Sequence, residues 1–467
     1  MVTVPELTHT QFLLASSLDT TTRLLGTMVV FNMADLKLAP KEGDSFDTSQ
    51  AYAEGLDKQD SLAAKREEFA INGEELIYVD GNSLGRLPKR TMPVIQNRVE
   101  REWGEKLIRS WGSCGWYETS TRVGGKIAQM VGARSNEVIA CDSTSVNLFK
   151  LILAALALRP GRTKIVTDTL NFPSDIYVIE GCINLLGNRH ALQLVPSHDN
   201  DLTVDMETLE AAVDDTTALV LLSHVVFKSG FMYDGRAVTE LAHKAGALVL
   251  WDLSHAAGAV PVALNEWNAD FAVGCGYKYL NGGPGATAFL YVREDLQDQC
   301  SSPIWGWFGQ SRPFDFATSY TPAKGMARFL AGSPPLLQLA AVEAGVDVIK
   351  EVGMEALRAK SLQLSEYLIK LADERLSPLG YSVGTPRDPA QRGSHSRTTS
   401  ASGSRRSIPR LQRCGTWSSG SVERWRRSCT SSTLSTDLPL LDPTAIVQRR
   451  GQCGNSMILV ASGRFGS

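Results

Sequence analysis

Short apolar runs alternate with helical patterns through the middle of the chain, and this alternation restricts the fold more than any other feature. The runs of strand length are 164–167, 218–223, 247–251 and 271–273, and the helical patterns are 146–158, 206–213 and 236–245. Strands that alternate with helices form a mostly parallel sheet whose faces are covered by those helices. The sequence therefore predicts an α/β fold with a mostly parallel sheet flanked by helices.

A lysine stands in the loop between two of the predicted core strands. Lys278 follows the run 271–273, and the glycine-rich turn 282–285 leads into the apolar run 286–292. Burial near such strands favours the uncharged, nucleophilic amine, which is how lysines come to form Schiff bases. The alternative is a lysine whose charged end reaches solvent from the end of a strand. This stretch alone favours neither interpretation.

The neighbouring apolar run ends in an aspartate. Asp252 closes the run 247–251, at the carboxyl edge of the sheet where open α/β folds place their ligands. Pyridoxal phosphate requires a lysine for its aldehyde and a carboxylate for its pyridinium nitrogen, and Lys278 and Asp252 supply both. A helix N-cap would also explain Asp252, but it would not explain the coincidence with Lys278.

Other stretches contain residues suited to a cofactor site, each with a structural alternative. Thr144 and Ser145 begin a helical pattern, where hydroxyls either cap the helix or bind a phosphate. Phe172 precedes a proline and either offers its ring face to a planar cofactor or packs in the core. The aromatic, glycine-rich stretches 110–117 and 305–309 suit a pocket wall or a surface loop packed on a neighbour.

Composition argues against several other classes of protein. The 467 residues are 43% hydrophobic and 21% charged, as in soluble globular proteins. No apolar run reaches the roughly 18 residues of a membrane helix, so no membrane partner is expected. Eight cysteines without paired or metal-ligand spacing are typical of reduced thiols in a cytoplasmic protein, and no metal site is expected.

The last part of the chain differs in charge from the rest. Residues 391–467 hold twelve arginines, no lysine and three acids, a net charge of +9, so the first 390 residues carry −12 of the total of −3. The net negative charge of the first 390 residues argues against a nucleic-acid partner. The basic segment is either a disordered tail or a segment read after a change of reading frame. The predicted divisions are an N-terminal extension and arm (1–60), a large domain (61–335), the start of a small domain (336–390) and the tail (391–467).

Five motifs together resemble kynureninase, in its bacterial and fungal forms. They are 80–85 (DGNSLG), 171–175 (NFPSD), 251–255 (WDLSH), 277–281 (YKYLN) and 306–309 (GWFG). The resemblance runs from about Ser61 to Arg392 and implies the aspartate-aminotransferase-like (type I) fold of pyridoxal 5'-phosphate enzymes. It further implies hydrolysis of L-kynurenine to anthranilate and L-alanine, a step of tryptophan catabolism and NAD biosynthesis.

The resemblance also implies roles for residues of one subunit. Lys278 would hold the cofactor aldehyde, Asp252 would pair with the pyridinium, and Tyr277 would lie near the phosphate as a candidate proton donor. The remaining cofactor-binding positions that it implies are Thr144, Ser145, Phe172, Pro173, Ser174, Asp175, Ser223 and His255.

The resemblance also implies roles for four more positions, in subunit assembly and in substrate specificity. Trp307 and Ser333 match positions that reach the phosphate of the neighbouring subunit, which implies a homodimer. Trp116 and Gly332 match the bacterial forms, which favour kynurenine over 3-hydroxykynurenine.

Two alternative functions stay open. The family binds the substrate carboxylate through an arginine of the small domain, and beyond about Ser394 this chain matches nothing in that domain. A catalytically impaired protein that still binds the cofactor is therefore one alternative. The other is a cysteine desulfurase or class V aminotransferase, although those enzymes usually place histidine before the lysine, where this chain has Tyr277.

Overall fold

The computed structural model describes the central part of the chain and short pieces beyond it. The described residues are 47–71, 78–393, 395–396, 398–400 and 411–412. Most of the predicted N-terminal extension and most of the basic tail lie outside them.

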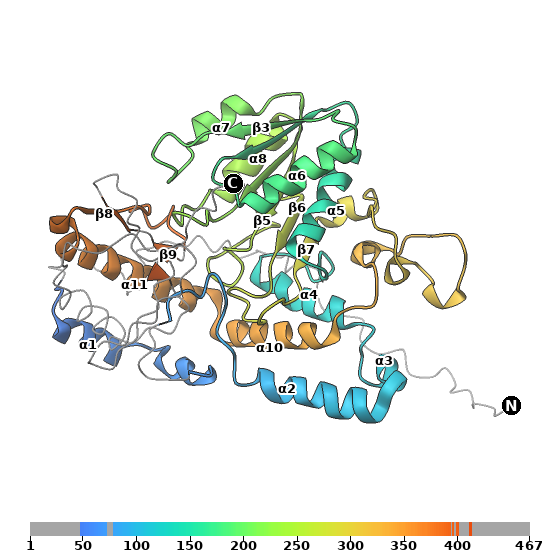
Figure 1. Ribbon diagram of the computed structural model, residues 1–467, viewed down its shortest axis with the longest axis horizontal. Coiled ribbons are helices and arrows are strands. Elements are labelled where there is room, and N and C mark those ends of the chain that lie inside the picture. Colours follow the sequence, from blue (N-terminus) through green and yellow to red (C-terminus); the bar gives the residue numbers. More distant parts are fainter. Residues whose placement is uncertain (1–46, 72–77, 394, 397, 401–410, 413–467) are drawn as a thin grey trace, which may run out of the picture. The chain divides into compact units, whose positions relative to one another are not determined.

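Helices make up much of the described chain (Figure 1). The α-helices are α1 (Gln50–Lys58), α2 (Thr91–Asn97), α3 (Ser110–Ser113), α4 (Thr119–Met130), α5 (Thr144–Ala157), α6 (Pro173–Leu185), α7 (Met206–Ala212), α8 (Gly235–Lys244), α9 (Glu294–Gln297), α10 (Leu336–Val352) and α11 (Met354–Arg375). Two shorter elements matter for the site: the 3-10 helices η4 (Trp307–Gly309) and η6 (Gly325–Phe329). A π-helix, η2 (Arg98–Lys106), continues α2.

One seven-stranded sheet forms the centre of the fold and confirms the predicted mostly parallel arrangement. Its spatial order is β1-β7-β6-β5-β4-β2-β3. Every neighbouring pair from β6 to β3 is parallel, whereas β7 is antiparallel to both β6 and β1. The strands are β1 (Val138–Ala140), β2 (Lys164–Asp168), β3 (Ala191–Val195), β4 (Thr217–Ser223), β5 (Leu248–Asp252), β6 (Phe271–Gly274) and β7 (Phe289–Val292).

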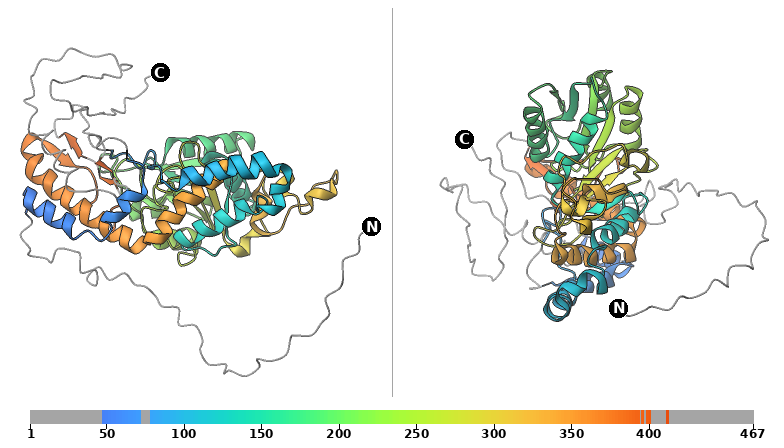
Figure 2. Two further views of the ribbon diagram at one scale, coloured as in Figure 1. Left: turned by 90° about the horizontal axis from the view of Figure 1, so that it is seen from below. Right: turned by 90° about the vertical axis from the view of Figure 1, so that its right-hand side faces the viewer.

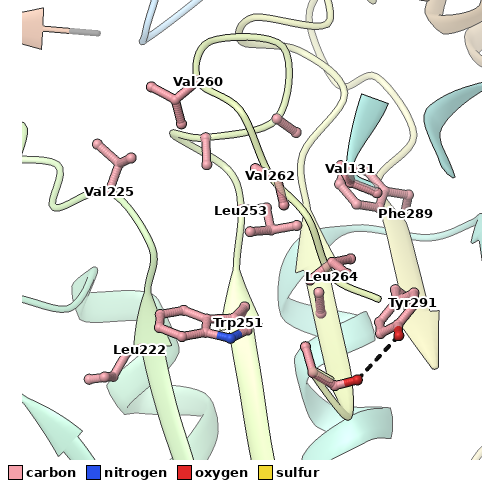
Figure 3. Close-up of a cluster of buried hydrophobic side chains, with 14 of the residues drawn as sticks. Val131, Leu222, Val225, Trp251, Leu253, Val260, Val262, Leu264, Phe289 and Tyr291 are labelled. Atoms are coloured by element: carbon pink, nitrogen blue, oxygen red, sulfur yellow. Dashed lines mark hydrogen bonds between the residues drawn. The ribbon is translucent and has the colours of Figure 1, made fainter. Parts of the chain in front are cut away.

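Alternate residues of each central strand enter two different hydrophobic layers. Leu222, Trp251 and Tyr291 belong to the layer that α4, α8 and α10 cover (Figure 3), while Leu221 belongs to the layer under α5 and α6. The Tyr291 hydroxyl donates a hydrogen bond to the Ala269 carbonyl (3.2 Å), which satisfies its polar end inside the core. Because both faces are covered, the strands are apolar along their whole length, and this is why they were recognisable as continuous runs.

The helices that follow the sheet pack back onto its flank. α10 lies against α4 and α2, as Figures 1 and 2 show, and α11 follows it after Gly353. Within the described residues, no helix has both the length and the apolar character needed to cross a membrane.

The packed part of the chain extends past the predicted boundary at residue 390. Arg392 is fully buried and its guanidinium donates to the Glu366 carboxylate (3.0 Å). The backbone N–H of Gly393 donates to the Gly230 carbonyl (2.6 Å), which ties this stretch to the loop after β4. Two short pairs of strands also involve this part of the chain: β8 (Tyr381–Val383) pairs with β10 (Thr398–Ser400), and β9 (His395–Ser396) pairs with β11 (Leu411–Gln412). The rest of the predicted tail lies outside the described residues.

Candidate active site

The carboxyl edge of the sheet brings the two predicted key residues together. β5 ends at Asp252, which lies in register with Ser223 at the end of β4 and with Val273 on β6. Lys278 follows β6 by four residues, so the lysine and the aspartate come from adjacent strands at one edge. Parallel strands that end together make such an edge a ligand site.

The Lys278 amine is enclosed by residues from three separate stretches. Its Nζ lies 2.7 Å from His255 Nε2, and both side chains are buried. The same nitrogen lies 5.6 Å from the centre of the Phe172 ring and 5.7 Å from that of Tyr277. Phe172 itself is 40% exposed, so its ring borders open space beside the amine. Three other residues named from the sequence are thus gathered around the Lys278 nitrogen atom.

Asn171 positions Phe172 and was not assigned a role from the sequence. Its side-chain oxygen accepts hydrogen bonds from the Ser223 hydroxyl (2.7 Å) and from the backbone N–H of Phe172 (2.8 Å). Its amide nitrogen donates to the Thr167 hydroxyl (2.9 Å). The loop after β2 is thereby fixed to the end of β4. Its place in the motif 171–175 is the feature of the sequence that could have indicated a role for Asn171.

Two carboxyl groups meet beside the lysine. Asp175, in the first turn of α6, is buried, and burial together with the negative charge and hydrogen bond of Asp252 raises its pKa well above the ordinary value. The two carboxyls therefore titrate as a pair, and their closeness favours the neutral form of Asp175. Ser174 donates from its hydroxyl to one Asp175 oxygen (3.3 Å), and the other oxygen, Oδ2, is buried without a hydrogen-bond partner among the described residues.

The Lys278 loop rests directly on the motif 80–85. The Gly85 backbone N–H donates to the Tyr277 carbonyl (2.9 Å). A Cβ atom at Gly85 would lie 2.1 Å from the Lys278 carbonyl oxygen and 2.4 Å from the Asn281 side-chain oxygen. Only glycine allows this approach, so the motif acts as a support for the lysine loop.

We expect Gly85→Ala to destabilise the protein by about 1–3 kcal/mol, because the added methyl group must displace the lysine loop. Denaturant unfolding of the purified variant measures this. Gly55→Ala is the matched control, since Gly55 lies in α1 with nothing within 4 Å of an added Cβ. Alanine there should stabilise the helix by roughly 0.5–1 kcal/mol. Equal behaviour of the two variants would contradict the supporting role of Gly85.

The start of α5 presents hydroxyl groups at the other side of the sheet edge. Ser143 caps the helix, its hydroxyl oxygen accepting from the Val146 N–H (3.4 Å). Thr144 is half-buried and Ser145 is exposed, so both remain accessible. A helix N-terminus with hydroxyls suits a phosphate group, because its N–H groups and dipole favour an anion.

The remaining predicted residues form a separate aromatic cluster. Trp116 is buried and its indole N–H donates to the Glu102 carboxylate (2.6 Å). The Trp111 ring lies between those of Trp116 (5.7 Å between centres) and Phe308 (5.5 Å). The Phe308 N–H donates to the Ala331 carbonyl (3.0 Å).

This contact brings the predicted residues Trp307, Gly332 and Ser333 into the same neighbourhood, where all three are exposed. None of the contacts found within the described residues joins this cluster to Lys278 of the same chain.

Comparison with known proteins decides the family. Residues 77–392 match the protein family described as Aminotransferase class-V. Kynureninase from Pseudomonas fluorescens is 47% identical over 344 residues, covering 73% of this chain and 80% of the relative. Kynureninase from Burkholderia mallei (strain SAVP1) is 42% identical over 343 residues, with the same coverage of both chains. The chain belongs to the kynureninase family.

Solved structures agree with this chain in fold. A cysteine desulfurase from Thermococcus onnurineus NA1 superimposes with a TM-score of 0.61 at 21% identity, covering 73% of this chain and 82% of its own. A C-DES variant with glycine covalently linked to its pyridoxal phosphate has a TM-score of 0.63 at 16% identity, covering 72% and 86%. The type I fold predicted from the motifs is therefore confirmed, and identities this low show the fold alone.

The kynureninase family uses pyridoxal phosphate, and the site fits that group. Asp175 lies beside Asp252, and its Oδ2 is buried without a hydrogen-bond partner among the described residues, so this acidic pair suits a protonated ring nitrogen that Asp252 would face. Lys278 Nζ lies 5.6 Å from the centre of the Phe172 ring. The open start of α5 suits the phosphate.

Proposed function

We propose that this protein hydrolyses L-kynurenine to anthranilate and L-alanine with pyridoxal phosphate attached to Lys278. The observation that carries the proposal is the meeting of Lys278, His255 and the Asp175–Asp252 pair at one sheet edge, in a chain 47% identical to a curated kynureninase. When bound, the cofactor supplies an electron sink for negative charge on the substrate.

The site residues divide the work of holding that group. Lys278 would bind its aldehyde, and Asp252, with Asp175 beside it, would pair with its ring nitrogen. Phe172 would cover one ring face, with Pro173 fixing the chain at the first turn of α6. Thr144 and Ser145 would bind the phosphate.

Two residues handle protons. His255 Nε2, 2.7 Å from Lys278 Nζ, can take a proton from the lysine amine and return it. Burial raises the pKa of Tyr277 to about 12, so its hydroxyl keeps its proton at neutral pH and can donate it to the ketone oxygen of the substrate.

The overall reaction balances with water alone. A water oxygen adds to the aryl ketone carbon, and the bond between that carbon and the substrate β-carbon breaks. The ring fragment leaves as anthranilate, which keeps the added oxygen. The β-carbon takes up a proton and becomes the methyl group of alanine. No oxidant or second substrate is needed.

The exposed aromatic residues of one loop support assembly as a homodimer. Trp305, Phe314 and Phe316 are 65%, 64% and 77% exposed, and Trp307 is 42% exposed. Several exposed aromatic side chains on one loop are typical of an interaction site. A second copy seated there would let Trp307 and Ser333 reach its phosphate, and would place Trp116 and Gly332 near its substrate. Sedimentation of the cofactor-loaded protein measures the assembly.

The reaction would place the protein in tryptophan catabolism and NAD biosynthesis, and we propose the cytoplasm as its location. The five cysteines within the described residues are all free thiols, in agreement with a reducing compartment.

Product analysis tests the proposal. Purified protein with pyridoxal phosphate is incubated with kynurenine, and anthranilate and alanine are quantified by chromatography. We expect equal amounts of both. A parallel incubation with cysteine tests the desulfurase alternative: release of sulfide or persulfide without anthranilate from kynurenine would overturn the proposal.

Trp116 and Gly332 are expected to set the preference between substrates. An indole lacks a hydrogen-bond acceptor for a 3-hydroxyl group and fills the space that the group needs, so kynurenine should have the higher kcat/KM. Trp116→His should shift the ratio towards 3-hydroxykynurenine by roughly tenfold or more, the scale of one gained hydrogen bond. A wild-type preference for the hydroxylated substrate would contradict this assignment.

The substrate carboxylate is expected to be weakly bound. The family match ends at residue 392, before the region in which relatives place the carboxylate-binding arginine. Loss of a bidentate contact should raise KM by about two to three orders of magnitude, on the order of 3–4 kcal/mol. Kynurenine and its α-carboxamide should then have similar kcat/KM values. A strong preference for the free carboxylate would show that another arginine has taken over this role.

A further inference from the structure

A fully buried lysine lies on the second turn of α5. Lys150 has no exposed side-chain surface, and its neighbours Leu148, Leu151 and Ile152 are core residues. An ammonium in such surroundings needs oxygen partners, and replacing a buried ion pair by apolar residues is often neutral or stabilising. The stability of the fold alone therefore does not account for a lysine at this position.

The oxygen partners of Lys150 belong to two separate loops. Its Nζ lies 2.5 Å from an Asp142 carboxylate oxygen and 2.5 Å from the Phe329 carbonyl oxygen. Asp142 precedes the cap of α5 and has a left-handed backbone (φ 50°), with its carbonyl held by the Ala288 N–H (2.9 Å). Phe329 ends η6, four residues before Ser333. One ammonium thus joins the turn 142–145 to the segment 329–333.

We propose that Lys150 is a positioning residue for the cofactor phosphate, an inference that rests on the proposed function. It fixes the turn that presents Thr144 and Ser145 to the phosphate of its own subunit. Through Phe329 it also fixes the segment that carries Ser333 towards the phosphate of the neighbouring subunit. Each Lys150 would in this way act on both phosphate sites of the dimer, through Asp142 on its own and through Phe329 on the neighbour's.

Lys150 has a second effect, on charge. Asp142 is the acid next to the cap of the phosphate-binding helix, and its side chain is 29% exposed. A carboxylate there would repel a phosphate dianion. The ammonium of Lys150 cancels that charge from inside the core, where solvent cannot replace it.

The test compares binding of pyridoxal phosphate with binding of pyridoxal, which lacks the phosphate, to the apo form of the full chain. Lys150→Met should weaken pyridoxal phosphate by roughly 10- to 100-fold, the scale of an uncompensated charge several ångströms from the phosphate. Pyridoxal binding should not change. Lys360→Met is the matched control, because Lys360 is also buried and paired, with Asp60 (2.5 Å). It should leave the ratio of the two affinities unaltered.

A double variant separates charge from general packing. Adding Asp142→Asn to Lys150→Met removes both charges and should restore the part of the affinity for pyridoxal phosphate that is lost through charge, while the part lost because the ammonium no longer holds the two segments stays lost. Equal weakening of both ligands by Lys150→Met, or no recovery in the double variant, would overturn the proposal.

If Lys150→Met does not fold, Asp142→Asn alone decides. It should keep or tighten pyridoxal phosphate binding with pyridoxal unchanged, and a loss specific to the phosphate form would refute the role. Wild-type protein that binds neither ligand would instead refute the proposed function.

Discussion

Lys278→Ala should abolish covalent attachment of the cofactor and lower kcat by roughly four orders of magnitude or more, since no other group can replace a covalent nucleophile. Borohydride reduction followed by peptide mass spectrometry measures the attachment directly. In the wild type, the pyridoxyl adduct should map to the peptide that contains Lys278. In the variant no adduct should form, although the phosphate can still bind.

His255→Gln serves as a companion to that variant. It keeps a polar side chain beside the amine but removes the imidazole 2.7 Å from Lys278 Nζ. The adduct should still map to Lys278, while turnover falls because proton transfer at the amine is impaired. An adduct that persists in Lys278→Ala would mean that another lysine carries the cofactor.

Asp252→Asn should lower kcat/KM by about two to four orders of magnitude, corresponding to about 3–5 kcal/mol for a buried charge left without its partner. The neutral amide cannot stabilise a protonated pyridine nitrogen, so the cofactor loses much of its power as an electron sink. Steady-state kinetics with kynurenine measures the loss, and the borohydride-trapped adduct shows that the cofactor is still attached.

Asp175→Asn is the natural comparison. Burial and the neighbouring Asp252 raise the pKa of Asp175 and so favour its neutral form, which the amide of asparagine resembles. Its kcat/KM should therefore fall far less than that of Asp252→Asn. The reverse order of effects would assign the charged partner to Asp175 and remove Asp252 from that role.

The central strands and the Lys278–Asp252 pair could be predicted because they depend on simple rules. A strand covered on both faces is continuously apolar, and the carboxyl ends of parallel strands share one edge. The edge strand β3 was not predicted, because several of its residues are exposed and the apolar pattern is weak. α6 was missed because its apolar residues are not confined to one face: Tyr177 is 66% exposed while Ile179 is buried.

Residues whose role depends on a partner far away in the chain could not be identified from the sequence. Lys150 occurs in an apolar helical pattern, and nothing nearby indicates that Phe329 lies against it. The raised pKa of Asp175 comes from its burial and from Asp252, which is 77 positions away in the sequence and comes close only through the sheet. Gly85 is part of a conspicuous turn motif, but its contact with the Lys278 carbonyl appears only once the two loops are packed together.

Hydrolysis of kynurenine at the Lys278 site requires that one oxygen atom of anthranilate come from water, and oxygen labelling measures this. Purified wild-type protein turns over kynurenine in water enriched in oxygen-18, and the products are analysed by mass spectrometry. We predict anthranilate with one labelled carboxylate oxygen, alanine in equal amount, and neither product from Lys278→Ala. Cofactor-loaded protein that forms no anthranilate, or that converts kynurenine to a keto acid instead of releasing alanine, would contradict the claim.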